Sequence, residues 1–167
     1  LFHGGIANRL KVKLHYIDSE LLTPENAFEQ LEKMDGILVA PGFGERGTEG
    51  KIAAIKIART NKIPFFGICL GMQMAIVEFA RNVVGIEGAN SGENRPDHPE
   101  NVIDLMPEQA GHEETGGTMR LGSQTTVLKE GTLIAKVYNN TTISERHRHR
   151  YEVMNEFVPK FEDAGMT

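Results

Sequence analysis

The chain contains one cysteine, Cys69, and its neighbours are those that a cysteine nucleophile requires. It lies in the sequence GICLGMQ, after the apolar residues 63–68 and before a helical pattern over residues 70–81. A sharp turn from a strand into a helix exposes a side chain at the carboxyl edge of a sheet, where α/β proteins bind ligands. The helix N-terminus favours an anion there, and Gly67 and Gly71 allow a tight turn and close approach of a substrate.

An alternative is that Cys69 is a small buried apolar residue, which is the commonest state of a lone cysteine. The strand–G-x-C-x-G–helix context favours the nucleophile. Backbone N–H groups stabilise the oxyanion formed in acyl transfer. We expect Leu70 to supply one, and Gly42 another from the glycine-rich turn at 41–47, since Pro41 has no N–H. Without further context this turn is also compatible with an ordinary connection between a strand and a helix.

The elements that would position these residues alternate between strand and helix. The patterns predict strands at residues 11–18, 36–40, 63–68, 102–105, 124–128 and 143–153. They predict helices from Thr23 with Phe28 and Leu31 buried, over 51–60 with Ile52, Ile55 and Ala58 buried, over 70–81 and over 153–166, while 1–10 has the pattern of a helix end. Residues 91–118 are typical of a long surface loop. The fold class expected is α/β, a doubly wound, mostly parallel sheet flanked by helices with flavodoxin-like layering.

Composition places limits on the class of protein. The chain has 167 residues, 40% hydrophobic and 25% charged, which fits one globular domain or part of one. A formal net charge of −5 argues against a general nucleic-acid binder, and no apolar run reaches the roughly 18 residues of a membrane span. One thiol suggests a reducing compartment, most simply the cytoplasm. Both ends interrupt expected elements, which predicts a domain, 1–167, incomplete at both ends.

Five segments together resemble the class I glutamine amidotransferase (glutaminase) domain of the CTP synthases. They are PGFGERGTEGK (41–51), PFFGICLGMQ (64–73), ANSGE (89–93), GGTMRLG (116–122) and ERHRHRYEV (145–153). The glycine turn and the cysteine element are shared by class I amidotransferases in general, whereas the last two segments are more particular to the CTP synthases. The resemblance spans nearly the whole chain.

This resemblance implies roles for individual residues. Cys69 attacks the side-chain amide of glutamine, giving a thioester and ammonia. The N–H groups of Gly42 and Leu70 form the oxyanion hole. Glu93 suits the α-ammonium of glutamine and Arg150 its α-carboxylate, because a guanidinium pairs bidentately with a carboxylate. The glutamine-binding residues implied are Gly42, Leu70, Gly71, Met72, Gln73, Glu93 and Arg150, and Phe43 with the loop to Gly50 resembles the lid linked in this family to GTP activation.

The residues alone leave other interpretations open. Glu93 in a polar loop is compatible with simple solvation. The arginines and histidines of 146–150 alternate, so in a strand they face opposite sides. Such a patch is also compatible with a nucleic-acid surface or a metal site. No carboxylate or cysteine completes a recognisable ligand pattern with His147 and His149, so no metal and no cofactor are expected in this domain.

The sequence departs from the family pattern in three places. Many relatives have two glycines in place of Pro41-Gly42, and threonine in place of Gly92. A class I amidotransferase also needs a histidine general base in a His-Pro-Glu segment after the last matching motif. His98-Pro99-Glu100 spells this tripeptide but falls before that point, and we interpret it as a coincidence. The 167 residues alone are therefore expected to be nearly inactive.

The resemblance also implies a larger enzyme. A synthetase domain, absent from this chain, would bind UTP, ATP and magnesium and convert UTP to CTP with the ammonia released here. GTP is implied as an allosteric activator, and a homotetramer is implied through the synthetase domain, with no nucleic-acid or membrane partner. Two alternatives are another cysteine hydrolase of the same fold and a non-catalytic regulatory or assembly domain.

Overall fold

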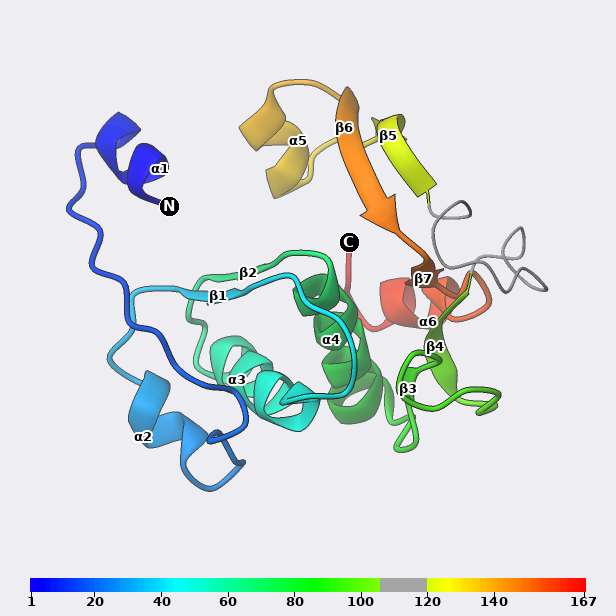
Figure 1. The fold of residues 1–167 in the computed structure, drawn as a ribbon. Helices are drawn as coiled ribbons and strands as arrows, with labels where there is room; N and C mark the ends of the chain where they lie inside the picture. Colours follow the sequence, from blue (N-terminus) through cyan, green and yellow to red (C-terminus); the bar gives the residue numbers. More distant parts are fainter. Residues whose placement is uncertain (106–119) are drawn as a thin grey trace.

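The computed structural model describes residues 1–105 and 120–167 as an α/β structure in which short strands alternate with helices (Figure 1). The helices are α1 (Phe2–Ala7), α2 (Ala27–Leu31), α3 (Thr48–Thr60), α4 (Leu70–Phe79), α5 (Leu133–Tyr138) and α6 (Val158–Asp163), with a π-helical turn η1 (Ala80–Val84) directly after α4. The strands are β1 (Ile37–Val39), β2 (Phe65–Gly67), β3 (Asn90–Ser91), β4 (Asn101–Leu105), β5 (Arg120–Val127), β6 (Thr142–His149) and β7 (Tyr151–Val153). The predicted α/β class is confirmed.

The first half of the chain consists of two parallel strands with helices packed on them. β1 and β2 pair in parallel, with Val39 opposite Gly67. Each is followed by a helix, α3 after β1 and α4 after β2, and Figure 1 shows both helices on the same side of the strand pair. Because parallel strands end at the same edge, the turn after β1 and Cys69 after β2 lie side by side.

The second half is mostly antiparallel. β3 pairs in parallel with β4, and β4 pairs antiparallel with β7, which sets Leu105 opposite Tyr151 and Ile103 opposite Val153. β5 and β6 form a separate antiparallel ladder. The chain leaves β6 at His149, bends at Arg150 and enters β7 at Tyr151. Arg150 therefore lies at the junction of two sheets.

Helix α4 is the centre of the larger apolar core. Met74, Val77 and Ala80 have no exposed surface, and they pack with Val102 and Ile103 of β4, which are equally buried. The smaller core lies between α2 and α3 and comprises Leu22, Ala27, Leu31, Ala53 and Ala54. Helix α3 contributes side chains to both cores, and α4 to the larger one. Their burial stabilises the positions of the two helices and of the turns that precede them.

Several sequence predictions are confirmed and others are wrong. The helices at 51–60 and 70–81 are confirmed, and Ile52, Ile55 and Ala58 are buried as expected. The strand predicted at 11–18 is wrong, because this segment joins no ladder among the described residues. The helix expected from Thr23 begins only at Ala27.

Other corrections concern exposure and element ends. Phe28 was expected to be buried but is 48% exposed, since only the opposite side of the short helix α2 contacts α3. Leu38 and Phe66 of the two parallel strands are also exposed, whereas their neighbours Ile37, Val39 and Phe65 pack in the larger core. The strand predicted at 143–153 is two strands, β6 and β7, and helix α5 was not predicted. Part of the predicted loop 91–118 lies outside the described residues.

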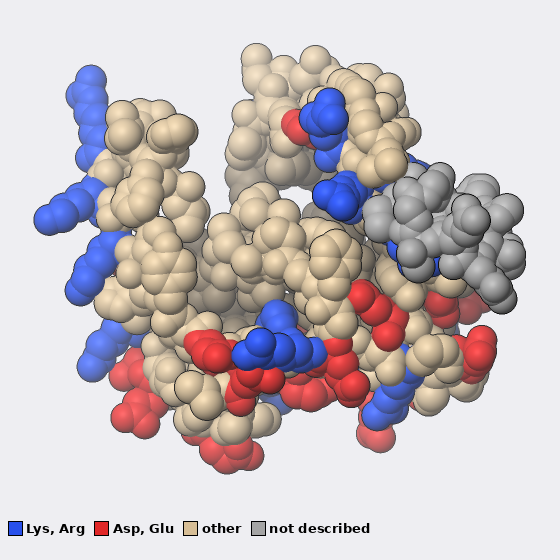
Figure 2. Space-filling view, viewed as in Figure 1, with Lys and Arg blue, Asp and Glu red and all other residues tan. Residues whose placement is uncertain are grey.

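Charged side chains are distributed unevenly over the surface. Figure 2 shows acidic side chains gathered on the half of this face that carries α2 and α3, and basic ones along the N-terminal segment and near β6. This arrangement agrees with a net negative charge of −5. In the described ranges, no helix has the length and apolar character required to cross a membrane.

An ion pair between a partly exposed arginine and a buried carboxylate joins α3 to α4. Arg59 donates from Nε and Nη2 to both carboxylate oxygens of Glu78, at 2.9 and 2.8 Å, and the Glu78 side chain is 1% exposed. The substitution Arg59→Met is expected to lower the free energy of unfolding by about 3 kcal/mol, because it leaves a buried carboxylate without a counter-charge. Urea unfolding followed by circular dichroism measures this change.

The matched control is Arg46→Met, which breaks the exposed Arg46–Glu20 pair, whose side chains are 75% and 44% exposed. Its expected cost is about 1 kcal/mol or less. Equal losses of stability in the two variants would contradict the structural role assigned to the Arg59–Glu78 pair.

Candidate functional site

Cys69 occupies a strained turn between β2 and α4. Its backbone has φ +54° and ψ −109°, a conformation that residues with a side chain rarely adopt. The turn is held by hydrogen bonds from Gly71 N–H to the Ile68 carbonyl (3.0 Å) and from Gln73 N–H to the Cys69 carbonyl (3.1 Å). The predicted strand–turn–helix placement of Cys69 is confirmed, and its partial exposure makes the thiol accessible.

The glycines on either side of Cys69 are required by close backbone packing. A side-chain carbon at Gly67 would lie 2.6 Å from the carbonyl carbon and oxygen of Gly71. A side-chain carbon at Gly71 would overlap the carbonyl oxygen of Val39 in β1. Because these contacts are with backbone atoms, they cannot be relieved by a side-chain rotation. Glycine at both positions therefore allows the start of α4 to pack directly on β1 and β2.

Cys69 opens into a pocket of about 250 Å³ formed by four separate parts of the chain. Its lining residues are Gly42, Phe43, Cys69, Gln73, Glu93, His149, Arg150 and Tyr151. Five of them, Gly42, Cys69, Gln73, Glu93 and Arg150, belong to the site expected from the sequence. They come from the turn after β1, the start of α4, the end of β3 and the β6–β7 junction.

The three other predicted residues, Leu70, Gly71 and Met72, do not line this pocket. Leu70 is 2% exposed and Gly71 is buried, while the Met72 side chain is 42% exposed. Any contact of Leu70 with a ligand would therefore use its backbone. Gly42 lies beside Leu70, since a side-chain carbon built on Gly42 would be 3.2 Å from Leu70 Cδ2. The two predicted oxyanion donors are thus in neighbouring segments.

Two lining residues leave buried polar atoms without a partner. Gln73 is 5% exposed, and its Oε1 makes no hydrogen bond within the described ranges. The same holds for Nε of Arg150. A buried polar atom left unpaired costs about 1–3 kcal/mol. These atoms are consistent with a pocket that binds a polar ligand.

His149 was not among the predicted site residues. Its Nε2 lies 2.8 Å from Nδ1 of His147, and its Nδ1 lies 3.8 Å from a carboxylate oxygen of Glu152, which also pairs with Arg120 at 2.7 Å. The i, i+2 spacing of the histidines indicated a shared face, but the bend at Arg150 that brings Glu152 to His149 has no signal in the sequence. Tyr151 joins the lining through the same bend, and Phe43 joins it from the turn after β1.

Burial lowers the pKa of His149 below its ordinary value of 6.5, and the neighbouring His147 and Arg120 act in the same direction, whereas Glu152 opposes them. His149 is therefore neutral in the folded protein at pH 7. Burial together with the Glu93 carboxylate raises the pKa of Tyr151, so that its phenol stays protonated. In the described part of the chain, no three His, Cys, Asp or Glu side chains are grouped so as to hold a metal ion.

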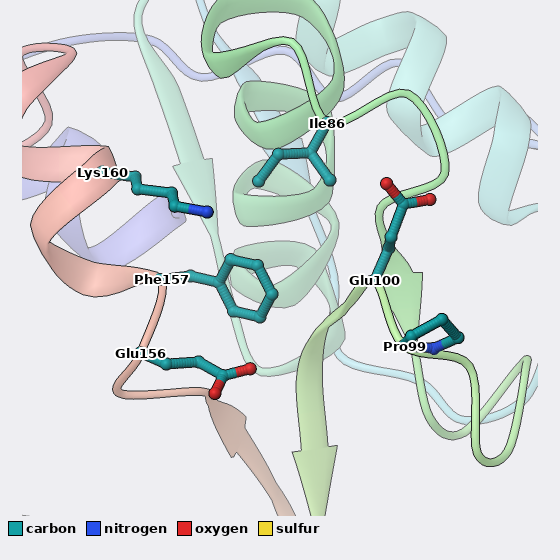
Figure 3. A pocket seen from close by; sticks show the side chains of 6 residues that line it. All are labelled: Ile86, Pro99, Glu100, Glu156, Phe157 and Lys160. Carbon is teal, nitrogen blue, oxygen red and sulfur yellow. The ribbon is translucent and has the colours of Figure 1, made fainter.

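A second depression, of about 440 Å³, lies between α6 and the segments around Ile86 and Glu100 (Figure 3). It is lined by Ile86, Pro99, Glu100, Glu156, Phe157 and Lys160. Lys160 Nζ lies 5.4 Å from the centre of the Phe157 ring. This depression has no nucleophile. Pro99 and Glu100 of the His98-Pro99-Glu100 tripeptide line it and do not line the Cys69 pocket, which supports our interpretation of the tripeptide as a coincidence.

Comparison with known proteins agrees with this geometry. The model of the family "Glutamine amidotransferase class-I" matches residues 1–165. The chain therefore belongs to the class I glutamine amidotransferase family, and the predicted fold class is confirmed at the level of the family.

Among curated proteins the chain is similar to CTP synthases. It is 59% identical over 167 residues to CTP synthase of Geobacter metallireducens, 55% identical over 166 residues to that of Methanosarcina barkeri, and 53% identical over 166 residues to that of Listeria innocua. These alignments cover 99–100% of the chain but only 31% of each relative. The chain thus spans about a third of the length of these proteins, and the resemblance inferred from its motifs is confirmed.

A solved structure has the same fold. It is the glutaminase domain of Trypanosoma brucei CTPS with bound acivicin, with a TM-score of 0.88 and 39% identity. The similarity covers 98% of this chain and 63% of that chain.

The state of His149 predicts a dependence of stability on pH. The unfolded chain binds a proton at this residue near pH 6.5, whereas the folded chain binds it only at lower pH. The contribution of neutral His149 is therefore complete above about pH 6.5 and is lost as the pH falls through the window below it. We expect the melting temperature to fall less steeply between pH 7 and pH 5 in His149→Gln than in the parent.

The control for this measurement is His3→Gln, which changes an exposed histidine of α1. It should keep the pH dependence of the parent. The comparison uses slopes, because loss of the His147 contact also shifts the absolute melting temperature. Identical slopes in the His149 variant and the parent would be incompatible with a neutral His149.

Proposed function

We propose that this chain is the glutaminase part of a CTP synthase and that Cys69 is its nucleophile. The observation that carries the proposal is the composition of the Cys69 pocket. A carboxylate, Glu93, and a guanidinium, Arg150, line the same pocket as the thiol. An amino acid substrate offers an ammonium and a carboxylate, which these two groups complement. Pockets for drug-sized ligands measure about 300–1,000 Å³. The Cys69 pocket, at about 250 Å³, therefore suits a smaller ligand such as an amino acid.

The chemistry follows from the nucleophile and its surroundings. The Cys69 thiolate attacks the carbon of the side-chain amide, and the carbonyl oxygen becomes an oxyanion that accepts hydrogen bonds from Gly42 and Leu70 N–H. Collapse of this intermediate breaks the C–N bond, and ammonia leaves after its nitrogen takes up the proton that the Cys69 thiol gave to the general base of the full-length enzyme. Water then hydrolyses the thioester to glutamate and the free thiol. Preformed N–H donors lower the barrier because they stabilise charge that appears only along the reaction path.

The similarity to known proteins supports glutamine over other amides. The related structure contains acivicin, a glutamine analogue, in a CTPS glutaminase domain. Gly71 and Met72 join the proposed glutamine site through their backbone, and Gln73 through a buried side-chain amide. Another cysteine hydrolase of this fold would not require a paired carboxylate and guanidinium for the α-ammonium and α-carboxylate.

The proposal extends to the larger enzyme. The relatives named CTP synthase are about three times as long as this chain, which covers 31% of each. We propose that a synthetase domain in the same polypeptide uses the ammonia to convert UTP to CTP with ATP and magnesium. GTP as activator, assembly into a homotetramer through that domain and a cytoplasmic location belong to the same proposal.

The first test is modification of the full-length polypeptide by a diazo-ketone analogue of glutamine, followed by intact mass and peptide mapping. We expect one adduct, on Cys69, and protection by glutamine. The substitution Cys69→Ser should abolish the adduct and lower the glutaminase kcat by at least about 10³-fold, because the reaction proceeds through this side chain. A full-length protein that hydrolyses glutamine but gives no adduct on Cys69 would refute the assignment of the nucleophile.

A second test concerns recognition of the substrate. Arg150→Ala should raise the KM for glutamine about 10- to 100-fold, because it removes a hydrogen-bonded charge pair with the substrate. Ammonia-dependent activity of the full-length protein should be retained, since ammonia does not need this pocket. The matched control is Arg146→Ala, an exposed arginine four residues earlier on β6. An unchanged KM in Arg150→Ala would favour another cysteine hydrolase of this fold.

A further inference from the structure

Among residues 1–105 and 120–167, the turn after β1, residues 41–44, is anchored by a single backbone hydrogen bond. Before it, the Val39 carbonyl accepts from Ile68 N–H at 3.0 Å, and after it, Thr48 N–H donates to the Glu45 carbonyl at 3.2 Å. Between these points Gly44 N–H donates to Glu93 Oε1 at 2.8 Å. Within the described ranges, the backbone of residues 41–44 makes no other hydrogen bond.

Side-chain packing does not replace this hydrogen bond. Phe43, the one large side chain of the turn, is 72% exposed. Gly44 has φ +75°, and nothing lies within 4 Å of the position that a side-chain carbon would occupy. Gly42 contacts Leu70 but has no side chain with which to anchor itself. The position of the Gly42 N–H therefore depends on the hydrogen bond that Gly44, two residues further along the turn, donates to the Glu93 carboxylate.

Glu93, in contrast, projects from a rigid part of the core. Ser91 is 1% exposed, and its Oγ accepts from Glu93 N–H at 3.3 Å. Gly92 N–H donates to the carbonyl of Ile103, a residue of β4 with no exposed surface, at 2.8 Å. The hydrogen bond thus connects a side chain whose backbone is held by the core to a turn with little other support among the described residues.

We infer that Glu93 is a positioning residue for the oxyanion hole in addition to its role in binding the substrate. One carboxylate oxygen, Oε1, holds Gly44 N–H and so places the N–H of Gly42. The other oxygen remains available for the α-ammonium, since a carboxylate can accept several hydrogen bonds. The same side chain therefore couples recognition of the amino acid to the geometry that stabilises the oxyanion. This inference rests on the proposed function and assigns Glu93 a second task within it.

The test compares Glu93→Gln with Glu93→Met in the full-length polypeptide. Glutamine keeps a carbonyl oxygen that can accept from Gly44 N–H but loses the charge, whereas methionine has a similar length and no oxygen acceptor. With glutamine as substrate both variants should show a raised KM. With 4-carbamoylbutanoate, which lacks the α-amino group, the kcat of Glu93→Met should be about 10- to 100-fold below that of Glu93→Gln, the usual effect of losing a hydrogen bond to a charged group.

Amide hydrogen exchange of residues 41–47 gives a readout that does not depend on activity. Exchange of the Gly44 amide should be about 10- to 100-fold faster in Glu93→Met than in Glu93→Gln, because only methionine removes the acceptor of this N–H. The control, Glu45→Met, removes an exposed carboxylate from the same loop and should leave this exchange close to that of the parent. Equal exchange and equal kcat in the two Glu93 variants would overturn the inference.

Failure of the proposed function gives a different pattern. In that case the parent does not hydrolyse glutamine and Cys69 is not modified by the diazo-ketone, yet the two Glu93 variants still differ in hydrogen exchange. A parent that hydrolyses glutamine, together with Glu93 variants that exchange alike, would leave the proposed function intact and reject the positioning role alone.

Discussion

The site depends on one constraint, the close backbone packing of the β2–α4 turn against β1. A side-chain carbon at Gly71 would overlap the Val39 carbonyl, and one at Gly67 would meet the backbone of Gly71. Cys69 lies between these glycines in a backbone conformation that is unfavourable for a residue with a side chain. Met74 and Val77 of α4 are buried in the larger core, and their packing fixes the helix that begins at this turn. The strained cysteine is therefore supported by the largest apolar core of the structure.

The remaining functional groups reach the pocket from elements with different degrees of support. Gln73 belongs to α4 itself, and Glu93 follows a short strand whose residues are almost completely buried. Arg150 lies at the bend between β6 and β7, where β7 is tied to β4 by antiparallel pairing. Judged by contacts within the described part of the chain, the turn that carries Gly42 is the least supported of these segments, because it has glycines, an exposed phenylalanine and one hydrogen bond to Glu93. A rigid nucleophile thus faces a turn whose position is set by a carboxylate.

Polar side chains near the β6–β7 bend contact one another. His147, His149, Glu152 and Arg120 form a continuous set of contacts next to Arg150. Burial keeps His149 neutral, which lets one histidine ring donate to the other without repulsion between two charged rings. Substrate recognition through Arg150 would therefore be sensitive to residues that do not contact the substrate.

The sequence by itself determined the α/β class, the helices around residues 51–60 and 70–81, and the position of Cys69 at a strand-to-helix turn. These features depend on local patterns, namely apolar periodicity and glycine next to the cysteine. The sequence also indicated Gly42, Gln73, Glu93 and Arg150, and all four line the pocket of Cys69.

Only the tertiary structure decided how these residues meet and which others join them. The exposure of Phe28, Leu38 and Phe66 depends on which faces other elements cover, and a sequence pattern does not contain this information. The division of residues 143–153 into two strands, and with it the place of His149 in the pocket, results from pairing with different partner strands, β5 and β4. The hydrogen bond from Gly44 to Glu93 joins residues 49 positions apart. Such contacts arise from packing between distant segments, which is why local sequence predicted the nucleophile but not the network that positions its partners.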